Sequence, residues 1–336
     1  MRRDQRQEAT MKAVRIHEHG GPEVLVYEDV PDPEPGPRQV LVRVEAATVN
    51  PVDVAVREGR FPTPKQPPKI LGSDGAGVVE RVGAEVTSVR PGDEVIFSGL
   101  GIGSEGSYAE YALIAEAQAV PKPPSLSFVD AAALGMVFPT AYYGLVRRGD
   151  LQAGETVLVQ GGAGGVGSAS IQIAKARGAR VLTTVGGAEA ADLVRSLGAD
   201  EVIDYKTEDV VARVKELTDG RGVDLVHELV ISANLATDLK LIVKGGRIVC
   251  TGEGPSSQVS LPIGEALGVD ATLLFMSLNN AGRAGVAAIM REVAAMAADG
   301  TVRAVVGATL PLREARRAHE MLEGEHVGKI VLLPRG

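Results

Sequence analysis

From Met11 to about Ala119, apolar residues alternate with polar ones in short runs. The runs QVLVRVEAATVN and DEVIFSG are typical, and segments rich in Gly and Pro separate them. Alternation with a period of two, bounded by turn residues, predicts β-strands. The segments PDPEPGPR and FPTPKQPPK cannot be central strands, because proline lacks the amide hydrogen that pairs strands. This part of the chain is therefore predicted to be a β-rich domain with proline-rich surface loops.

The pattern changes after Val120. Three prolines precede Ser127, and an apolar stretch with helical periodicity follows. Serine is a favoured N-cap residue, because its side chain accepts a hydrogen bond from an amide of the first turn. The sequence predicts one helix from Phe128 to about Arg148, joining two domains.

Beyond Leu151, short apolar runs alternate with helical stretches such as AEAADLVRSLG and EDVVARVKELT. The predicted strands are Thr156 to Gln160, Arg180 to Val185, Glu201 to Asp204, Asp224 to Glu228 and Arg247 to Thr251. This alternation predicts an α/β fold with a doubly wound parallel sheet. After residue 279 a helix, a strand, a second helix and the strand KIVLL are expected to fold back onto the first domain.

A glycine cluster follows the first strand of the alternating region. Gly162, Gly164 and Gly167 fit the spacing G-x-G-x-x-G between a buried strand and a helix. Such glycines allow a tight turn, close approach of the backbone to a diphosphate, and close packing of helix on strand. The helix N-terminus then faces the phosphates. The spacing alone is weak in a chain with 41 glycines, but its position between strand and helix favours a dinucleotide site over a turn without a ligand.

Composition narrows the possible functions. The chain has 336 residues, enough for about two domains. The net charge of −8 disfavours a nucleic-acid or anionic-membrane partner. A single cysteine, Cys250, excludes an intrachain disulfide and favours a cytoplasmic setting. No apolar run approaches the ~18 residues of a membrane helix, and the polar residues 1–10 are expected to be a disordered lead without a signal-peptide core.

Histidines offer no metal-binding pattern. Apart from His17 and His19, they have no partner at metal-ligand spacing, and surface imidazoles are the preferred interpretation. The other three are His227, His319 and His326. No metal site is predicted.

Several motifs together resemble the medium-chain dehydrogenase/reductase superfamily, and specifically its zinc-independent quinone oxidoreductase (zeta-crystallin-like) branch. They are VRIHEHGGPEVL, VNPVDVAVREG, LGSDGAGVVERVG, PGDEVIF, GSYAEYA, FPTAYYGL, the glycine stretch, NLATDLKLIVKGGRIV and GKIVLL. The resemblance implies a GroES-like catalytic domain at 11–130, completed by 279–336, and a Rossmann NADP-binding domain at 131–278. It also implies a cleft between them for NADPH and substrate.

The resemblance also implies site residues. Asn50 and Ser73 stand where zinc-dependent relatives have a cysteine and a histidine ligand, so zinc is not expected. Cofactor contacts are implied for Ala163, Gly164, Gly165, Val166, Gly186, Tyr205, Asn234, Thr251, Gly252, Glu253, Gly254, Met276, Ser277 and Leu278. For some of these the alternative is structural: Asn234 would cap the following helix, and Met276 would fill the core.

Coenzyme preference depends on the end of the second Rossmann strand. NAD-binding enzymes usually place an acidic residue there, but this chain has Thr183 to Gly187. NADPH is therefore predicted. Lys206 is a candidate for pairing with the adenosine phosphate, with a solvated surface charge as the equal alternative. Some relatives carry a lysine shortly after Gly187, where this chain has Glu189 and Ala190.

The expected chemistry is hydride transfer from NADPH to a quinone. Without a metal, the acceptor oxygen needs a hydrogen-bond donor or a proton from water. Asn50, Thr140 and Tyr142 are the candidate catalytic donors, although Tyr142 could equally be a buried helix residue. Many relatives have a tyrosine where this chain has Ala55. The alternatives are an enone or alkenal double-bond reductase and a non-catalytic NADPH-binding protein. A homodimer or homotetramer is implied by the resemblance.

Overall fold

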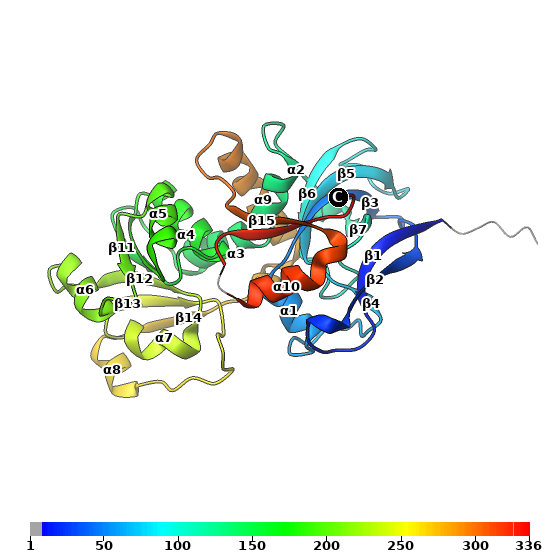
Figure 1. Cartoon of the computed structure of the whole chain (residues 1–336). Helices are drawn as coiled ribbons and strands as arrows, with labels where there is room; N and C mark the ends of the chain where they lie inside the picture. Colours follow the sequence, from blue (N-terminus) through cyan, green and yellow to red (C-terminus); the bar gives the residue numbers. More distant parts are fainter. Residues whose placement is uncertain (1–8, 325) are drawn as a thin grey trace, which may run out of the picture. The chain divides into compact units, whose positions relative to one another are not determined.

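The computed structural model describes residues 9–324 and 326–336 (Figure 1). Most of the expected disordered lead, residues 1–8, lies outside the described residues, and the first strand begins at Thr10. The chain divides into two compact units. The first consists of Met1–Met136, Arg283–Ala298 and Ala304–Gly336, and the second of Val137–Gly282 and Asp299–Arg303. The second unit is thus inserted into the first along the sequence.

The first unit is built on β-sheets, as the alternating pattern predicts. Its strands are β1 (Thr10–Ile16), β2 (Leu25–Pro31), β3 (Gln39–Thr48), β4 (Lys69–Ile70), β5 (Asp74–Val82), β6 (Glu94–Ser98), β7 (Tyr111–Ala115), β8 (Val120–Pro121), β15 (Val306–Pro311) and β16 (Lys329–Leu333). A seven-stranded sheet has the order β15-β16-β3-β5-β6-β8, with β7 paired to β3, and a smaller sheet has the order β2-β1-β4. The C-terminal strand β16 pairs antiparallel with β3.

Helices and short 3-10 turns complete the first unit. They are η1 (Pro22–Val24), α1 (Pro51–Arg57), η2 (Glu116–Gln118), α2 (Phe128–Leu134), η5 (Leu312–Glu314) and α10 (Ala315–Glu323), together with most of α9 (Gly282–Ala298). The core contains the inward residues of β1, β3, β5 and β6, with Leu312 and Ala318 from the C-terminal segment. The tail therefore contributes to the same hydrophobic core as the N-terminal strands.

The second unit has the predicted doubly wound fold. Its parallel strands are β9 (Thr156–Val159), β10 (Arg180–Val185), β11 (Glu201–Asp204), β12 (Val223–Glu228), β13 (Ile242–Cys250) and β14 (Thr272–Phe275), in the order β11-β10-β9-β12-β13-β14. Its helices are α3 (Val137–Tyr142), α4 (Gly165–Ala176), α5 (Ala188–Ser196), α6 (Val210–Leu217), α7 (Ile231–Asp238) and α8 (Ile263–Gly268), and a 3-10 turn, η4 (Leu278–Ala281), follows β14. Figure 1 shows α4 and α5 on one face of the sheet and α7 on the other. Strand β14 was not among the strands expected from the sequence.

The prediction of a single helix from Phe128 to about Arg148 is wrong. The chain forms α2, breaks at Gly135 and Met136, continues as α3, and ends in a π-helical turn, η3 (Tyr143–Arg148). Pro139 has no amide hydrogen for the carbonyl of Gly135, and its ring excludes a regular helix there. The Asp74 carboxylate lies at the same break, where its Oδ2 accepts the Met136 amide at 2.6 Å and would overlap a side chain on Gly135. The division between the two units falls at this break.

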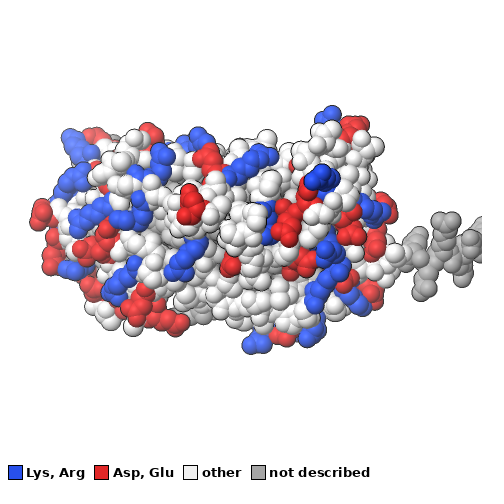
Figure 2. Space-filling view, turned by 90° about the horizontal axis from the view of Figure 1, so that it is seen from above, with Lys and Arg blue, Asp and Glu red and all other residues white. Residues whose placement is uncertain are grey.

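The stretch Phe128–Arg148 is also the one described segment long and apolar enough to span a membrane by length and composition. In its apolar 18-residue window, 72% of the residues are buried within the protein, so packing accounts for its apolar character. On the face shown in Figure 2, lysine and arginine are interspersed with aspartate and glutamate rather than gathered into a basic patch.

Candidate functional site

In the first unit, the predicted catalytic residue Asn50 lies between β3 and α1 and caps that helix. Pro51 follows at the first helical position, where a missing amide hydrogen costs nothing. The Asp53 carboxylate reaches back to accept the Asn50 amide at 2.9 Å, one half of a capping box. The segment Asn-Pro-Val-Asp therefore starts the helix and fixes Asn50 at its N-terminus.

Asn50 belongs to a buried polar cluster that also contains Thr48, Asp53, Ser73, Asp74 and Lys329. Its amide Nδ2 lies 3.1 Å from Asp74 Oδ1, and its Oδ1 accepts Lys329 Nζ at 2.6 Å. Asn50 is only 1% exposed. The structure thus places the Asn50 amide inside the cluster, with both ends of the side chain already in contact with protein groups.

The two aspartates of the cluster accept further hydrogen bonds. Ser73 Oγ donates to Asp53 Oδ1 at 2.8 Å, and Thr48 Oγ1 donates to Asp74 Oδ1 at 2.7 Å. Burial and the charge of Asp74 raise the pKa of Asp53 to about 7. Burial raises the pKa of Asp74 and lowers that of Lys329, while the opposite charges partly offset both changes. Near neutral pH the cluster can therefore take up or release a proton at Asp53.

A chain of hydrogen bonds extends from Asp53 to the C-terminal helix. Tyr108 Oη lies 3.3 Å from Asp53 Oδ2 and 3.2 Å from His319 Nε2, and His319 Nδ1 lies 3.1 Å from Arg57 Nη1. Arginine can only donate, so Nδ1 must accept and Nε2 must carry the hydrogen. His319 then donates to Tyr108, and Tyr108 donates to Asp53. Burial and the Arg57 charge lower the pKa of His319 to about 3, so the imidazole is neutral.

The expectation of surface imidazoles is wrong for His319 and His227, both of which are fully buried. In the second unit, His227 lies 2.8 Å from Ser170 Oγ through Nδ1 and 2.9 Å from Thr251 Oγ1 through Nε2. Burial lowers its pKa to about 4. Each buried imidazole is accounted for by two hydrogen-bond partners that lie far away in the sequence. Among the described residues, no group of three or more His, Cys, Asp or Glu side chains could hold a metal ion.

The predicted glycine turn joins β9 to α4 in the second unit. Gly164 caps α4 without a side-chain hydrogen bond, and Gly165 and Val166 form the first turn. A side chain on Gly167 would overlap Gly161 O, and one on Gly162 would overlap Thr183 Oγ1. These two glycines therefore permit close packing of α4 and β10 against the turn. Ala163 lies within the turn, and the amides of the first helical turn have no intrahelical acceptor.

Three predicted adenosine-side residues lie together beyond β10. A Cβ built on Gly186 would lie 2.6 Å from Tyr205 Oη and 2.9 Å from Lys206 Cε. Tyr205 is 54% exposed, and its amide donates to Val185 O at 3.1 Å. The glycine thus leaves room for an exposed aromatic ring and a lysine stem beside the end of the strand.

The remaining predicted cofactor residues follow the carboxyl ends of β12, β13 and β14. A pocket of about 280 Å³ opens there. Its lining residues are Ile231, Ser232, Cys250, Thr251, Gly252, Glu253, Ser256, Ser257, Gln258, Val259, Phe275 and Met276. Ligands of open α/β sheets bind outside the carboxyl ends of the strands. Predicted residues that lie next to the pocket in sequence but do not line it are Gly254, Ser277 and Leu278.

Three other predicted residues lie on helices of the second unit. Asn234 lies in α7, where its Nδ2 donates to Glu228 Oε1 at 3.3 Å. Thr140 and Tyr142 lie in α3 and are each 7% exposed. The Arg147 guanidinium lies 5.7 Å from the centre of the Tyr142 ring. Roles of these residues in binding or catalysis remain predictions.

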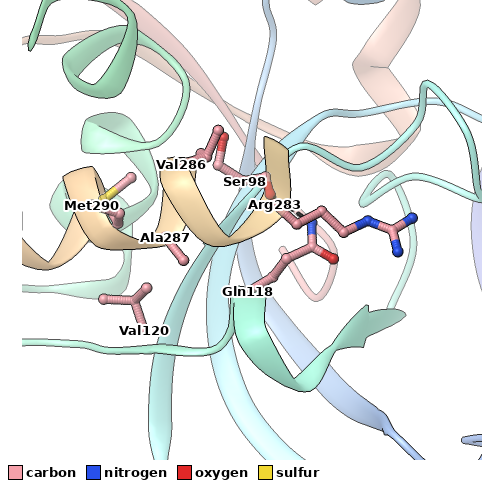
Figure 3. Close-up of a pocket in the computed structure, with 7 residues that line it drawn as sticks. All are labelled: Ser98, Gln118, Val120, Arg283, Val286, Ala287 and Met290. Atoms are coloured by element: carbon pink, nitrogen blue, oxygen red, sulfur yellow. Dashed lines mark hydrogen bonds between the residues drawn. The ribbon is translucent and has the colours of Figure 1, made fainter. Parts of the chain in front are cut away.

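A second, much smaller cavity of about 10 Å³ lies in the first unit and contains no predicted site residue. Figure 3 shows its lining from β6, from the segment around Gln118 and from one side of α9. Gln118 Nε2 donates to Ser98 O at 2.8 Å. This volume suits one water molecule at most, so the larger pocket of the second unit is the candidate ligand site.

Comparison with known proteins agrees with this geometry. Residues 36–124 match a family profile described as alcohol dehydrogenase GroES-like domain, and residues 197–332 match one described as zinc-binding dehydrogenase. The quinone oxidoreductase of Rattus norvegicus is 37% identical over 327 residues, which cover 96% of this chain and 98% of that protein.

The chain belongs to the quinone oxidoreductase branch of the medium-chain dehydrogenase/reductase superfamily. Among solved structures, Escherichia coli quinone oxidoreductase complexed with NADPH has a TM-score of 0.88 and 30% identity, with 96% of this chain and 100% of that chain covered. A structure described as an NAD-dependent alcohol dehydrogenase has a TM-score of 0.90 and 35% identity, with 96% and 99% covered. The predicted α/β fold, with a GroES-like and a Rossmann part, is confirmed.

Sequence reasoning missed several residues of these clusters. Lys329 and Tyr108 stand far from Asp53 in the sequence. In the second unit, Gln160 Nε2 donates to Asp238 Oδ1 at 2.8 Å, and no sequence spacing marks these two residues as partners. The sequence did mark Asp53 as a partner of Asn50, because Asn-Pro-x-Asp is a capping-box pattern. The other residues meet only through tertiary contacts, which a single sequence does not reveal.

Proposed function

We propose that this protein is an NADPH-dependent oxidoreductase that transfers hydride to quinones without a metal. The proposal is carried by the N-terminus of α4, where no side chain caps the free backbone amides. These amides lie at the carboxyl end of the parallel sheet, as does the pocket beyond β12, β13 and β14. Amides at a helix N-terminus bind phosphate through hydrogen bonds and the helix dipole. The membership of the chain in the quinone oxidoreductase branch supports the same function.

Each group of residues has a role in this proposal. The first-turn amides of α4 bind the diphosphate, with Gly164 and Gly165 allowing its close approach. Tyr205 and Lys206 flank the adenosine end beside Gly186. The pocket lined by Thr251, Gly252 and Met276 receives the nicotinamide end. When bound, NADPH supplies the hydride from its nicotinamide ring, and the protein orients it.

NADPH rather than NADH is proposed because no acidic side chain follows β10 at the position that would repel a 2′-phosphate. Lys206, beside Gly186, offers a positive charge. The E. coli relative was solved with NADPH, whereas another similar structure is described as NAD-dependent. A direct comparison of the two coenzymes is therefore informative.

Zinc independence rests on the donor atoms present. Asn50 and Ser73 stand where zinc-dependent relatives have ligands, and amide and hydroxyl groups are poor substitutes for thiolate and imidazole. The amine of Lys329 contacts Asn50 Oδ1 in the same cluster, so a cation already occupies these surroundings.

The test is NADPH oxidation by chelator-treated protein with a panel of quinones and enones. We expect turnover with quinones that chelation does not reduce. Faster turnover with enones would make the protein a double-bond reductase. NADPH binding without oxidation by any acceptor would make it a non-catalytic binding protein, and restoration of lost activity by zinc would contradict the metal-free mechanism.

We further propose a cytoplasmic homodimer or homotetramer. Strand β14 ends the six-stranded sheet, so one edge has unpaired backbone groups. Phe275 on this strand is 60% exposed, and Leu267 on α8 is 73% exposed. Sheet edges of this kind are usually covered by another chain or blocked by charge. Light scattering of the purified protein should give a mass of two or four chains.

A further inference from the structure

Two carboxyl groups are buried together in the second unit, outside the roles assigned so far. Glu228 is the last residue of β12 and Asp238 is the last residue of α7, and both side chains are fully buried. Among the ion pairs found in the described part of the chain, none involves either residue. The charge of this pair is therefore not balanced by a contacting lysine or arginine.

Each carboxyl group has one oxygen with donors and one without. Glu228 Oε1 accepts the Val230 amide and Asn234 Nδ2, and Asp238 Oδ1 accepts Gln160 Nε2 at 2.8 Å. Glu228 Oε2 and Asp238 Oδ2 are buried and have no donor among the described residues. Two buried acceptors without donors are costly, unless a proton lies between them.

The surroundings favour such a proton. Burial, and then the neighbouring carboxyl group of Glu228, raise the pKa of Asp238 to about 9. The other titratable groups packed nearby stay neutral. Burial raises the pKa of the Cys250 thiol to about 12, and His227 points to Ser170 and Thr251 with its pKa lowered to about 4. At neutral pH Asp238 can therefore donate its proton to Glu228.

We propose that Glu228 and Asp238 share one proton and that this pair is a positioning element for the coenzyme site. The inference rests on the proposed NADPH binding. Gln160, which donates to Asp238, accepts Thr184 Oγ1 at 2.7 Å, and Thr184 in turn accepts the Gly161 amide at 3.0 Å. This side of the network reaches the glycine turn.

The other side of the network reaches the pocket. Glu228 holds the turn from β12 into α7 through Val230 and Asn234, and the next residues, Ile231 and Ser232, line the pocket. One proton thus connects the segment proposed to bind the diphosphate with the segment proposed to bind the nicotinamide end. Loss of this proton would place two repelling charges between the segments.

Asp238→Asn is the informative variant. Its amide can donate to Glu228 and accept from Gln160, so it copies the protonated acid without being able to titrate. The infrared difference spectrum of wild type minus variant should contain the carbonyl band of a protonated carboxylic acid, since any band from Asp53 is common to both proteins. The NADPH dissociation constant of the variant should stay within about twofold of wild type at neutral pH and should not rise as the pH passes 9, whereas that of wild type should rise.

Asp238→Ala removes the donor and leaves Glu228 Oε2 unpaired, so its NADPH dissociation constant should rise about tenfold at neutral pH. Asp224→Asn is the matched control on the same strand. Asp224 forms an ion pair with Arg221. Burial alone would raise the pKa of Asp224, but hydrogen bonds, first of all that from Arg221, lower it. This control should leave the infrared band in place.

The infrared band and thermal unfolding as a function of pH do not need NADPH, so they separate this inference from the proposed function. Identical bands and identical pH profiles in wild type and Asp238→Asn would overturn the shared proton. A band that disappears in the variant, together with an unchanged NADPH affinity for Asp238→Ala, would overturn the positioning role. Absence of NADPH binding in wild type would overturn the proposed function and the positioning role, and would leave the shared proton to the infrared and unfolding measurements.

Discussion

The two units bury acidic pairs in different ways. In the first unit, Asp53 and Asp74 share a buried cluster with Lys329, whose amine donates to Asn50. The pKa of Asp53 there is raised to about 7. In the second unit, Glu228 and Asp238 have no such cation, and the pKa of Asp238 is about 9. The charge of Lys329 lowers the pKa of Asp53, whereas no lysine or arginine offsets the effect of burial on Asp238. Each cluster supports a helix terminus next to residues proposed to act in binding or catalysis.

Removing the cation should have the largest effect. Lys329→Met would remove the positive charge that lowers the pKa of the buried Asp53 and Asp74. Leaving a buried charge uncompensated typically costs about 3–5 kcal/mol. We expect a loss of this size in the free energy of unfolding, measured by urea denaturation. The pKa of Asp53 should rise toward that of Asp238.

The matched control is Lys12→Met, which removes an exposed ion pair with Asp29 in the same unit. Such pairs contribute little because water and salt screen them. A Lys329→Met protein no less stable than the Lys12→Met protein would show that Lys329 does not balance the cluster.

Breaking the link to the glycine turn should have the next largest effect. Gln160→Leu removes the donor to Asp238 and the acceptor of Thr184, both in buried surroundings. The cost of leaving such groups unpaired is about 1–3 kcal/mol. Calorimetry should show weaker NADPH binding as well as lower stability. Unchanged NADPH affinity would separate the buried network from the coenzyme site.

A smaller effect is expected for Tyr108→Phe. The substitution removes the hydroxyl between His319 and Asp53 while keeping the buried ring. A loss of about 1–2 kcal/mol is expected from the unpaired imidazole and the lost hydrogen bond. Thermal unfolding should detect it, and Tyr111→Phe, on a partly exposed residue of the same unit, serves as the control. Equal stability of both variants would contradict the chain from α10 to Asp53.

The pH dependence of stability should distinguish the two clusters. Both Asp53 and Asp238 have folded-state pKa values above the unfolded value of 3.8, so the folded protein holds the extra protons. Their contribution to stability is fully present below about pH 4 and is lost as the pH rises, through about 7 for Asp53 and about 9 for Asp238. In Asp238→Asn the loss between pH 7 and 9 should disappear, as measured by thermal unfolding across this range.

The smallest effect on stability is expected for Lys206→Ala, which lies outside both clusters beside Gly186. Loss of a charge partner for the 2′-phosphate should weaken NADPH binding about three- to tenfold and leave NADH binding unchanged. Titration with both coenzymes tests this. Equal weakening of both would make Lys206 a residue of the adenosine site without selectivity for the phosphate.

Local patterns were sufficient to predict much of the fold. The glycine turn, five of the six strands of the Rossmann sheet and the final helices and strands follow from periodicity and turn residues. The break at Gly135 was missed although Pro139 marks it, because proline has no amide hydrogen for the carbonyl four residues earlier. Only the contact of Asp74 with Met136 comes from a remote part of the chain. Strand β14 was missed because four residues after a short helix give little periodic signal.

Part of the candidate site could also be predicted from the sequence, and part could not. Gly186, Tyr205 and Lys206 were expected near one another and do lie together. The buried positions of His227 and His319 were not expected, since their partners are remote in sequence. Glu228 and Asp238 each look like ordinary acidic residues at the end of an element, and only the fold brings their unpaired oxygens into the same buried network.

The most direct test of the proposed function is a titration of chelator-treated protein with NADPH. We predict saturable binding at one site per chain, tighter than the binding of NADH under the same conditions. No measurable affinity for either coenzyme would contradict the assignment, whatever the similarity of the chain to quinone oxidoreductases.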